Sequence, residues 1–264
     1  MTQSLQPAPA SDELQVSRRD AVLWLTISRE SRRNAMSPAV LHGLREAIDA
    51  AQSDATLRAI VITGAGDKAF CAGADLQSGS AFTTDFSQPR ALFADLLRSA
   101  RASQVPLIAR VNGACMAGGM GLLSMCDLAV AARHAVFGLP EVKVGVFPAQ
   151  VMTVLQHLIP RRILTEMSIT GEPVTADQAL AIGLVNHVDD DVDERLQWLL
   201  SRLLDKSPSA IRRGLYTMKS VQTMDFEQSI AFTESQIALF ALTEDAKEGQ
   251  AAFREKRAPH WTGR

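Results

Sequence analysis

Two segments rich in glycine and alanine have the composition of loops that present backbone N–H groups to a ligand. The first runs from Cys71 to Leu76 (CAGADL) and the second from Asn112 to Leu122 (NGACMAGGMGL). Each follows an apolar run typical of a buried strand. Small side chains let a ligand oxygen approach the main chain, where unpaired N–H groups can donate to it. Taken alone, each segment is more commonly a tight turn or a close helix contact.

Gly118 marks the position where the second segment is predicted to become helical. Its N–H would have no partner inside the helix and would lie at the positive end of the helix dipole. If an N–H group of the first segment converged on it, the pair would form an oxyanion hole. Such donors stabilise a transition state by about 2.7–4 kcal/mol each.

Glu141 is the acidic residue whose surroundings best suit proton transfer. Its neighbours Phe137, Leu139, Pro140, Val142 and Val144 are all apolar. Burial among them would raise the carboxyl pKa and suit Glu141 to general acid–base catalysis near neutral pH. The alternative is a solvated ion pair with Lys143, because residues i and i+2 share one face of a strand.

Other chemistries have less support. Residues 64–69 (GAGDKA) match the weak form of the dinucleotide fingerprint, but no helix is predicted to open at these glycines. The five histidines include no H-x-x-x-H pair, so we expect no metal site. No G-x-S-x-G motif is present, which leaves a serine hydrolase without its nucleophile.

Strands that alternate with helices would position these segments. Apolar runs predict strands at 21–27, 59–63, 107–111, 128–132 and 135–138. Helices are predicted at 38–51, after the capping pair Ser37-Pro38, at about 89–102 and at 118–125. This order favours an α/β fold with a parallel sheet. Further helices are predicted at 151–158, 161–168, 175–182, 192–205, 208–222, 226–241 and 243–254.

Composition narrows the range of partners. The chain has 264 residues, 27 basic and 29 acidic side chains, and 5% aromatic residues. A nucleic-acid partner is therefore not expected. The apolar stretch 105–132 contains Arg110, Asn112 and Asp127, which argues against a membrane span. Three cysteines without a C-x-x-C pair, and no leader pattern in a flexible tail at 1–14, favour a cytoplasmic protein.

Several motifs in a fixed order resemble those of the crotonase, or enoyl-CoA hydratase/isomerase, superfamily. The likeness covers about residues 15–262. The motifs are RRNAMS at 32–37, VITGAGDKAFCAGADL at 61–76, the segment from Asn112 to Asp127, FGLPE at 137–141, TG at 170–171, ALAIGLVN at 179–186 and TEDAKEGQAAFREKR at 243–257. The resemblance implies a spiral core of ββα units at 15–200. It also implies a helical C-terminal trimerisation region at 201–264.

The resemblance also implies a ligand and roles for individual residues. Members bind acyl-CoA thioesters, need no separate cofactor and are commonly homotrimers or hexamers. The oxyanion-hole donors would be the N–H groups of Ala74 and Gly118, and Glu141 would be a catalytic carboxylate. The residues expected to bind coenzyme A or the rest of the substrate are Arg33, Lys68, Ala72, Ala74, Asp75, Leu76, Gly118, Phe253 and Lys256.

Two departures from the family pattern affect the acid–base side of the site. Hydratases of the family carry a second glutamate three residues after the oxyanion-hole glycine, where this chain has Gly121. The glycine-rich turn that usually follows the Pro-Glu segment is replaced by FPAQ at 147–150. Hydration of a 2-enoyl-CoA through Glu141 alone is the predicted reaction. The alternatives are Δ3-Δ2-enoyl-CoA isomerisation, another enolate reaction of the family, and non-catalytic binding of acyl-CoA.

Overall fold

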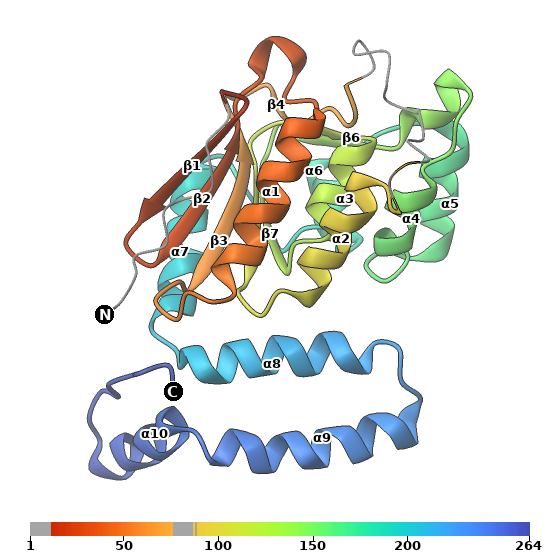
Figure 1. Ribbon diagram of the computed structural model, residues 1–264. Coiled ribbons are helices and arrows are strands. Elements are labelled where there is room, and N and C mark those ends of the chain that lie inside the picture. The colour runs from red at the N-terminus through yellow and green to blue at the C-terminus, as the bar shows by residue number, and fades with distance from the viewer. Residues whose placement is uncertain (1–11, 76–86, 88) are drawn as a thin grey trace.

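The computed structural model describes residues 12–75, 87 and 89–264, which form two sheets covered by helices (Figure 1). The larger sheet has the order β1-β2-β3-β5-β7-β10, with β1 antiparallel to β2 and the other neighbours parallel. Its strands are β1 Leu14–Arg19, β2 Val22–Ile27, β3 Ala59–Gly64, β5 Leu107–Val111, β7 Leu128–Ala132 and β10 His187–Asp189. Strand β1 begins at Leu14, where the sequence predicts the tail to end. The rest of that tail, 1–11, lies outside the described residues.

The smaller sheet consists of short described strands, and only the one at 136–138 falls within a run that the sequence predicts as a strand. Its order is β4-β6-β8-β9. The strands are β4 Ala69–Cys71, β6 Ala114–Met116, β8 Val136–Gly138 and β9 Val174–Thr175. Strands β4, β6 and β8 are parallel, and β9 is antiparallel to β8. The carboxyl ends of three parallel strands therefore lie next to one another.

Helices cover both faces of the larger sheet. Residues that alternate along β3 divide between two cores: Ile60 and Ile62 pack with residues of α1 (Pro38–Ala51) and α2 (Leu92–Ala102), whereas Val61 packs with α7 (Val192–Leu204). Ser37 caps α1 by accepting a hydrogen bond from Val40 N at 3.2 Å, as its sequence predicts. The remaining short helices of the core are η1 Glu30–Arg32, α3 Gly118–Ser124, η3 Pro140–Val144, α4 Ala149–Leu155, α5 Arg161–Thr170 and α6 Ala176–Ala181.

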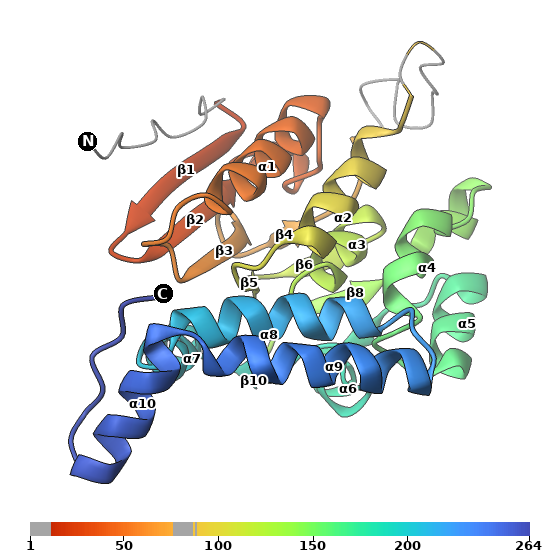
Figure 2. The same cartoon turned by 60° about the horizontal axis from the view of Figure 1, so that its bottom comes forward.

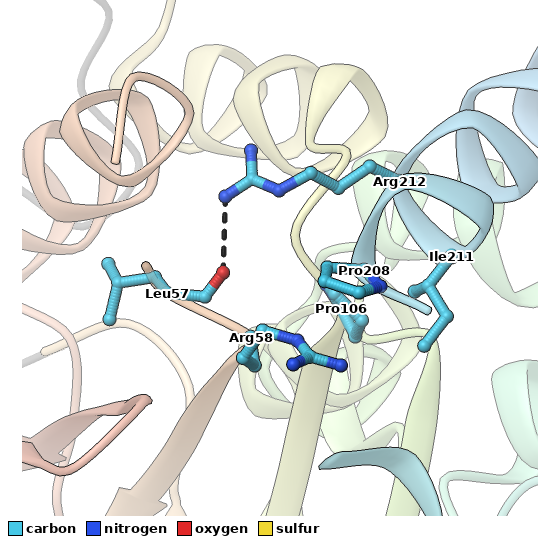
Figure 3. A pocket seen from close by; sticks show the side chains of 6 residues that line it. All are labelled: Leu57, Arg58, Pro106, Pro208, Ile211 and Arg212. Atoms are coloured by element: carbon cyan, nitrogen blue, oxygen red, sulfur yellow. Dashed lines mark hydrogen bonds between the residues drawn. The ribbon is translucent and has the colours of Figure 1, made fainter. Parts of the chain in front are cut away.

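The C-terminal helices α8 (Pro208–Val221), α9 (Phe226–Ala241) and α10 (Glu244–Glu255) form a separate layer beneath the core (Figures 1 and 2). Helix α8 attaches this layer to the core. Arg212 donates to the carbonyl of Leu57, just before β3, at 3.1 Å (Figure 3). Lys219 pairs with Asp127 at 2.9 Å. No helix in the described residues has the length and apolar composition needed to cross a membrane.

Candidate active site

The three residues assigned to chemistry follow the ends of three neighbouring parallel strands. Ala74 lies three residues after the end of β4, Gly118 two residues after the end of β6, and Glu141 three residues after the end of β8. Because β6 pairs with both β4 and β8, the topology gathers all three residues at one edge of the smaller sheet.

The backbone amides of Ala74 and Gly118, which the resemblance implies as oxyanion donors, lie close together. A Cβ atom added at Gly118 would lie 3.6 Å from Ala74 N and 3.5 Å from Gly73 Cα. In the described part of the chain, neither N–H donates to a protein acceptor. Helix α3 begins at Gly118, so the N–H of this residue has no partner within the helix. An oxyanion hole requires two nearby N–H groups that are free to donate.

The backbone on either side of the two donors keeps them unpaired. Met36 forms an isolated parallel β-bridge with Ala74: Met36 N donates to Gly73 O at 2.7 Å, and Asp75 N donates to Met36 O at 3.2 Å. Both hydrogen bonds use groups on either side of the Ala74 N–H. Gly73 has a φ of +95°, which an alanine rarely adopts. Ala117, directly before Gly118, also has a positive φ of 52°. Strain of this kind at a non-glycine residue persists only where its surroundings enforce it.

Glu141 is buried, and its surroundings favour the protonated carboxyl group. The residue is 9% exposed, and its Oε2 atom has no hydrogen-bond partner in the described residues. Burial raises the pKa of Glu141, and a hydrogen bond from its own backbone N–H opposes this shift. A raised carboxyl pKa suits a group that must both accept and return a proton.

The structure corrects the alternative role considered for Glu141. Residues 140–144 form the 3-10 helix η3, so Glu141 and Lys143 do not share a strand face. Lys143 pairs instead with Glu172 of another loop, at 2.8 Å. Pro140 occupies the first turn of η3, where its fixed φ favours a helix over a strand.

Phe93 fills the space beside Gly121, the position at which family hydratases have their second glutamate. A Cβ atom at Gly121 would lie 2.6 Å from Phe93 Cζ and 3.3 Å from Val151 Cγ2. These two side chains come from α2 and α4 and enclose the buried glycine. The missing carboxylate is thus replaced by an aromatic ring.

We expect Gly121→Glu to lower the free energy of unfolding by at least about 3 kcal/mol, because a larger side chain must displace the Phe93 ring and bury a charge. Urea unfolding of the purified variant measures this change. Adding Phe93→Ala to the same chain makes room and should recover part of the loss. A Gly121→Glu protein as stable as the wild type would contradict the close packing of Phe93.

The residues expected to bind coenzyme A fall into two groups, and the first surrounds the oxyanion loop. Ala72 N donates to the carbonyl of Arg33 at 3.1 Å, and Ala114 N donates to that of Lys68 at 3.0 Å. Both basic side chains are exposed beside the loop. Asp75 forms an ion pair with Arg29 at 2.7 Å. Leu76 lies outside the described residues.

The second group lies in the C-terminal layer, away from this edge. Phe253 and Lys256 belong to the end of α10, which packs against α8 and α9. Phe253 is 85% exposed. Figure 1 shows α10 at the end of the molecule opposite to β4 and β6. A single chain therefore does not bring these two residues to Glu141.

Two buried asparagines hold the turn before β4, a role that no sequence pattern predicted for them. The side-chain amides of Asn34 and Asn112 both donate to Ala69 O, at 2.7 and 3.2 Å. Asn34 also donates to Ala65 O and Asn112 to Gly66 O. The Asn-Gly pair at 112–113 and the RRNAMS motif were visible in the sequence, but only the fold shows that they converge on one turn.

In the described residues, no cluster of three or more potential metal ligands accompanies the site.

Comparison with known proteins assigns the chain to a family. The sequence model described as "Enoyl-CoA hydratase/isomerase" matches residues 17–264. The chain belongs to the enoyl-CoA hydratase/isomerase family. It is therefore an enzyme of that family, with the crotonase-like α/β fold, as the resemblance implies.

Relatives within the family align with this chain over almost their whole length. The 2,3-dehydroadipyl-CoA hydratase of Escherichia coli is 36% identical and covers 96% of this chain and 99% of its own. The crotonyl-CoA hydratase of Syntrophomonas wolfei is 31% identical, covering 94% and 97%. The crystal structure of an enoyl-CoA hydratase from Mycobacterium smegmatis has a TM-score of 0.87 at 33% identity, covering 94% and 98%.

Proposed function

We propose that this enzyme adds water across the C2–C3 double bond of a 2-enoyl-CoA thioester, with Glu141 as its only catalytic carboxylate. One observation carries the proposal: the buried Glu141 lies at the same sheet edge as the amides of Ala74 and Gly118. Within the part of the chain that the structure describes, neither its Oε2 nor these two amides has a hydrogen-bond partner. Relatives named as hydratases support the reaction type.

Each chemical step has a group to perform it. Glu141 accepts a proton from water as the water oxygen bonds to C3, and the C2–C3 π electrons move toward the thioester carbonyl. The oxygen becomes an enolate, which the N–H groups of Ala74 and Gly118 stabilise. Glu141 then returns the proton to C2, which restores the carbonyl. These steps consume water alone, so no cofactor beyond the coenzyme A of the substrate is required.

Among the buried residues that the structure describes, no second carboxylate lies beside Glu141, which supports the use of one group for both transfers. The buried carboxylates of the described residues are Glu141 and Asp245, and Asp245 lies in α10 among Ser207, Ser209 and residues 262–263. A single base is also sufficient for moving a double bond from C3 to C2, because it can remove a proton from C2 and deliver it to C4. Isomerisation is therefore the second candidate.

An absorbance assay distinguishes the candidates. Hydration of a 2-enoyl-CoA removes the conjugated double bond, so absorbance falls, whereas isomerisation of a 3-enoyl-CoA creates conjugation and absorbance rises. We expect the purified enzyme to decrease the absorbance of at least one member of a panel of straight, branched and aromatic 2-enoyl-CoAs. Conversion of 3-enoyl-CoAs alone would favour the isomerase, and binding without either change would favour a non-catalytic protein.

The exposed basic and apolar residues support binding of coenzyme A by an assembled oligomer. Arg33 and Lys68 would contact its phosphates from the chain that holds the oxyanion loop. Phe253 and Lys256 would line the coenzyme A site of a neighbouring copy. Helix α9 also exposes large apolar side chains, including Phe226 and Ile237 at 75% and 69%. We expect a homotrimer or a hexamer in equilibrium sedimentation, and a monomer would contradict this arrangement.

The cysteines support a cytoplasmic location. Cys71, Cys115 and Cys126 are free thiols. Burial raises the pKa of Cys71 to about 12, so this thiol is unreactive at neutral pH. Free buried thiols are typical of proteins in a reducing compartment.

A further inference from the structure

We infer that Arg29 positions the oxyanion donor Ala74 by pairing with Asp75, the next residue along the chain. The inference rests on the proposed oxyanion function of Ala74. Neither the proposed reaction nor the coenzyme A site assigns a role to Arg29. Its side chain nevertheless forms an ion pair with the residue directly after the proposed oxyanion donor.

Arg29 connects the oxyanion loop to the preceding turn through several bonds. Its Nη2 atom lies 2.7 Å from Asp75 Oδ2, and its Nη1 atom donates to Ala35 O at 2.6 Å. Its Nε atom lies 3.0 Å from Glu13 Oε1, and its backbone N–H donates to Asn34 Oδ1 at 3.0 Å. The guanidinium group thus fixes Asp75 relative to Ala35, whose neighbour Met36 pairs with the loop.

This arrangement determines where the Ala74 N–H points. The two Met36 hydrogen bonds hold the main chain of Gly73 and Asp75, on either side of Ala74. Gly73, at a φ of +95°, adds little resistance to rotation of the loop. The ion pair is a side-chain contact that restrains the residue after Ala74. A displacement of about 1 Å in a catalytic group can cost about 100-fold in rate.

The burial of the pair makes it a fixed contact. The side chains of Arg29 and Asp75 are only 12% and 11% exposed, and charges interact strongly in such partly buried surroundings.

The role can be tested with Arg29→Met, Asp75→Asn and the double variant. We expect Arg29→Met to lower kcat about 100-fold while the Kd of free coenzyme A stays within about twofold, because the side chain is only 12% exposed. The two side chains act through one contact, so the double variant should lose no more than about threefold beyond Arg29→Met alone. Arg29→Lys, which can still pair with Asp75, should lose less than Arg29→Met.

Arg110→Met is the matched control. Arg110 lies on β5 and binds both carboxylate oxygens of Asp193 at 2.6 Å, so the variant also removes a half-buried arginine and its ion pair. We expect its kcat to stay within about threefold of the wild type. An equal loss in both arginine variants would show a general structural effect and would overturn the inference. So would a loss confined to coenzyme A affinity, or losses from Arg29→Met and Asp75→Asn that add up in the double variant.

A second measurement separates this inference from the proposed reaction. A 3-ketoacyl-CoA forms an enolate with its own ultraviolet absorbance, and the oxyanion donors should raise the enolate fraction of the bound ligand without turnover. Arg29→Met should reduce this fraction and Arg110→Met should not. A wild-type enzyme that stabilises the enolate but leaves 2-enoyl-CoAs unchanged would contradict the hydratase alone. One that does not stabilise the enolate would overturn the oxyanion site and the role of Arg29 with it.

Discussion

Replacing Glu141 with glutamine is expected to lower kcat by about 10³- to 10⁴-fold, toward the upper range for loss of a general acid–base group. The loss is large because one carboxylate performs both proton transfers in the proposed reaction, and the space beside Gly121 is filled by Phe93. The affinity for a saturated acyl-CoA should change by less than about threefold, because glutamine preserves the shape of the side chain. Stopped-flow absorbance and calorimetric titration measure the two quantities.

The pH profile provides an independent check on the same residue. Burial raises the pKa of Glu141 above its usual value of 4.5. The first step requires the carboxylate, so kcat/KM should fall as the pH decreases through this raised pKa. The unfolded state has the lower pKa, so ionisation of Glu141 destabilises the folded protein as the pH rises. At pH 7 the glutamine variant should therefore be at least as stable as the wild type.

Glu172→Gln is the control for both measurements, because this exposed glutamate pairs with Lys143 outside the site. We expect wild-type kcat and an unchanged pH profile. Substantial hydration by Glu141→Gln would show that another group transfers the proton.

Gly118→Ala is expected to reduce kcat/KM by about 10²- to 10³-fold, the loss typical of one oxyanion donor. The new methyl group would lie 3.6 Å from Ala74 N, in the space that the substrate oxygen must enter. Its other close contact, at 3.0 Å, is the flexible end of Met36. The side chain can move, so the loss should appear in activity with little change in the thermal midpoint.

Gly214→Ala is the matched control, because Gly214 lies in α8 and an added Cβ would contact nothing within 4 Å. Alanine is favoured over glycine in a helix by about 1 kcal/mol, so this variant should be active and equally or more stable. If Gly118→Ala hydrates substrate at the wild-type rate, the oxygen does not bind between Ala74 and Gly118.

Long periodic elements could be predicted from the sequence with accurate bounds. Strands 107–111 and 128–132 and helix 226–241 lie where the apolar patterns place them. The strands β4 and β6 could not be recognised, because three residues are too short to show a period of two. They were included in the glycine-rich segments, although their pairing is what brings Ala74 and Gly118 together.

The site was predictable where it depends on local sequence. Gly118 begins a helix and Glu141 is buried, as their neighbours suggest. Arg29 and Asp75 are 46 residues apart, and no local pattern connects them. The contact between Phe93 and Gly121 likewise arises from the packing of α2 against α3. Such contacts depend on the tertiary arrangement of elements and leave no trace in the spacing of residues.

The proposed oxyanion donors are main-chain atoms, and this limits how mutation can affect them. Every amino acid except proline carries a backbone N–H, so almost every codon change at Ala74 or Gly118 retains the donor itself. Such a change can obstruct or displace the donor without deleting it. The carboxylate at position 141, in contrast, is lost on any substitution except Glu141→Asp. Mutations that alter the chemistry of this enzyme while preserving enolate stabilisation should therefore concentrate on the side chains around the carboxylate.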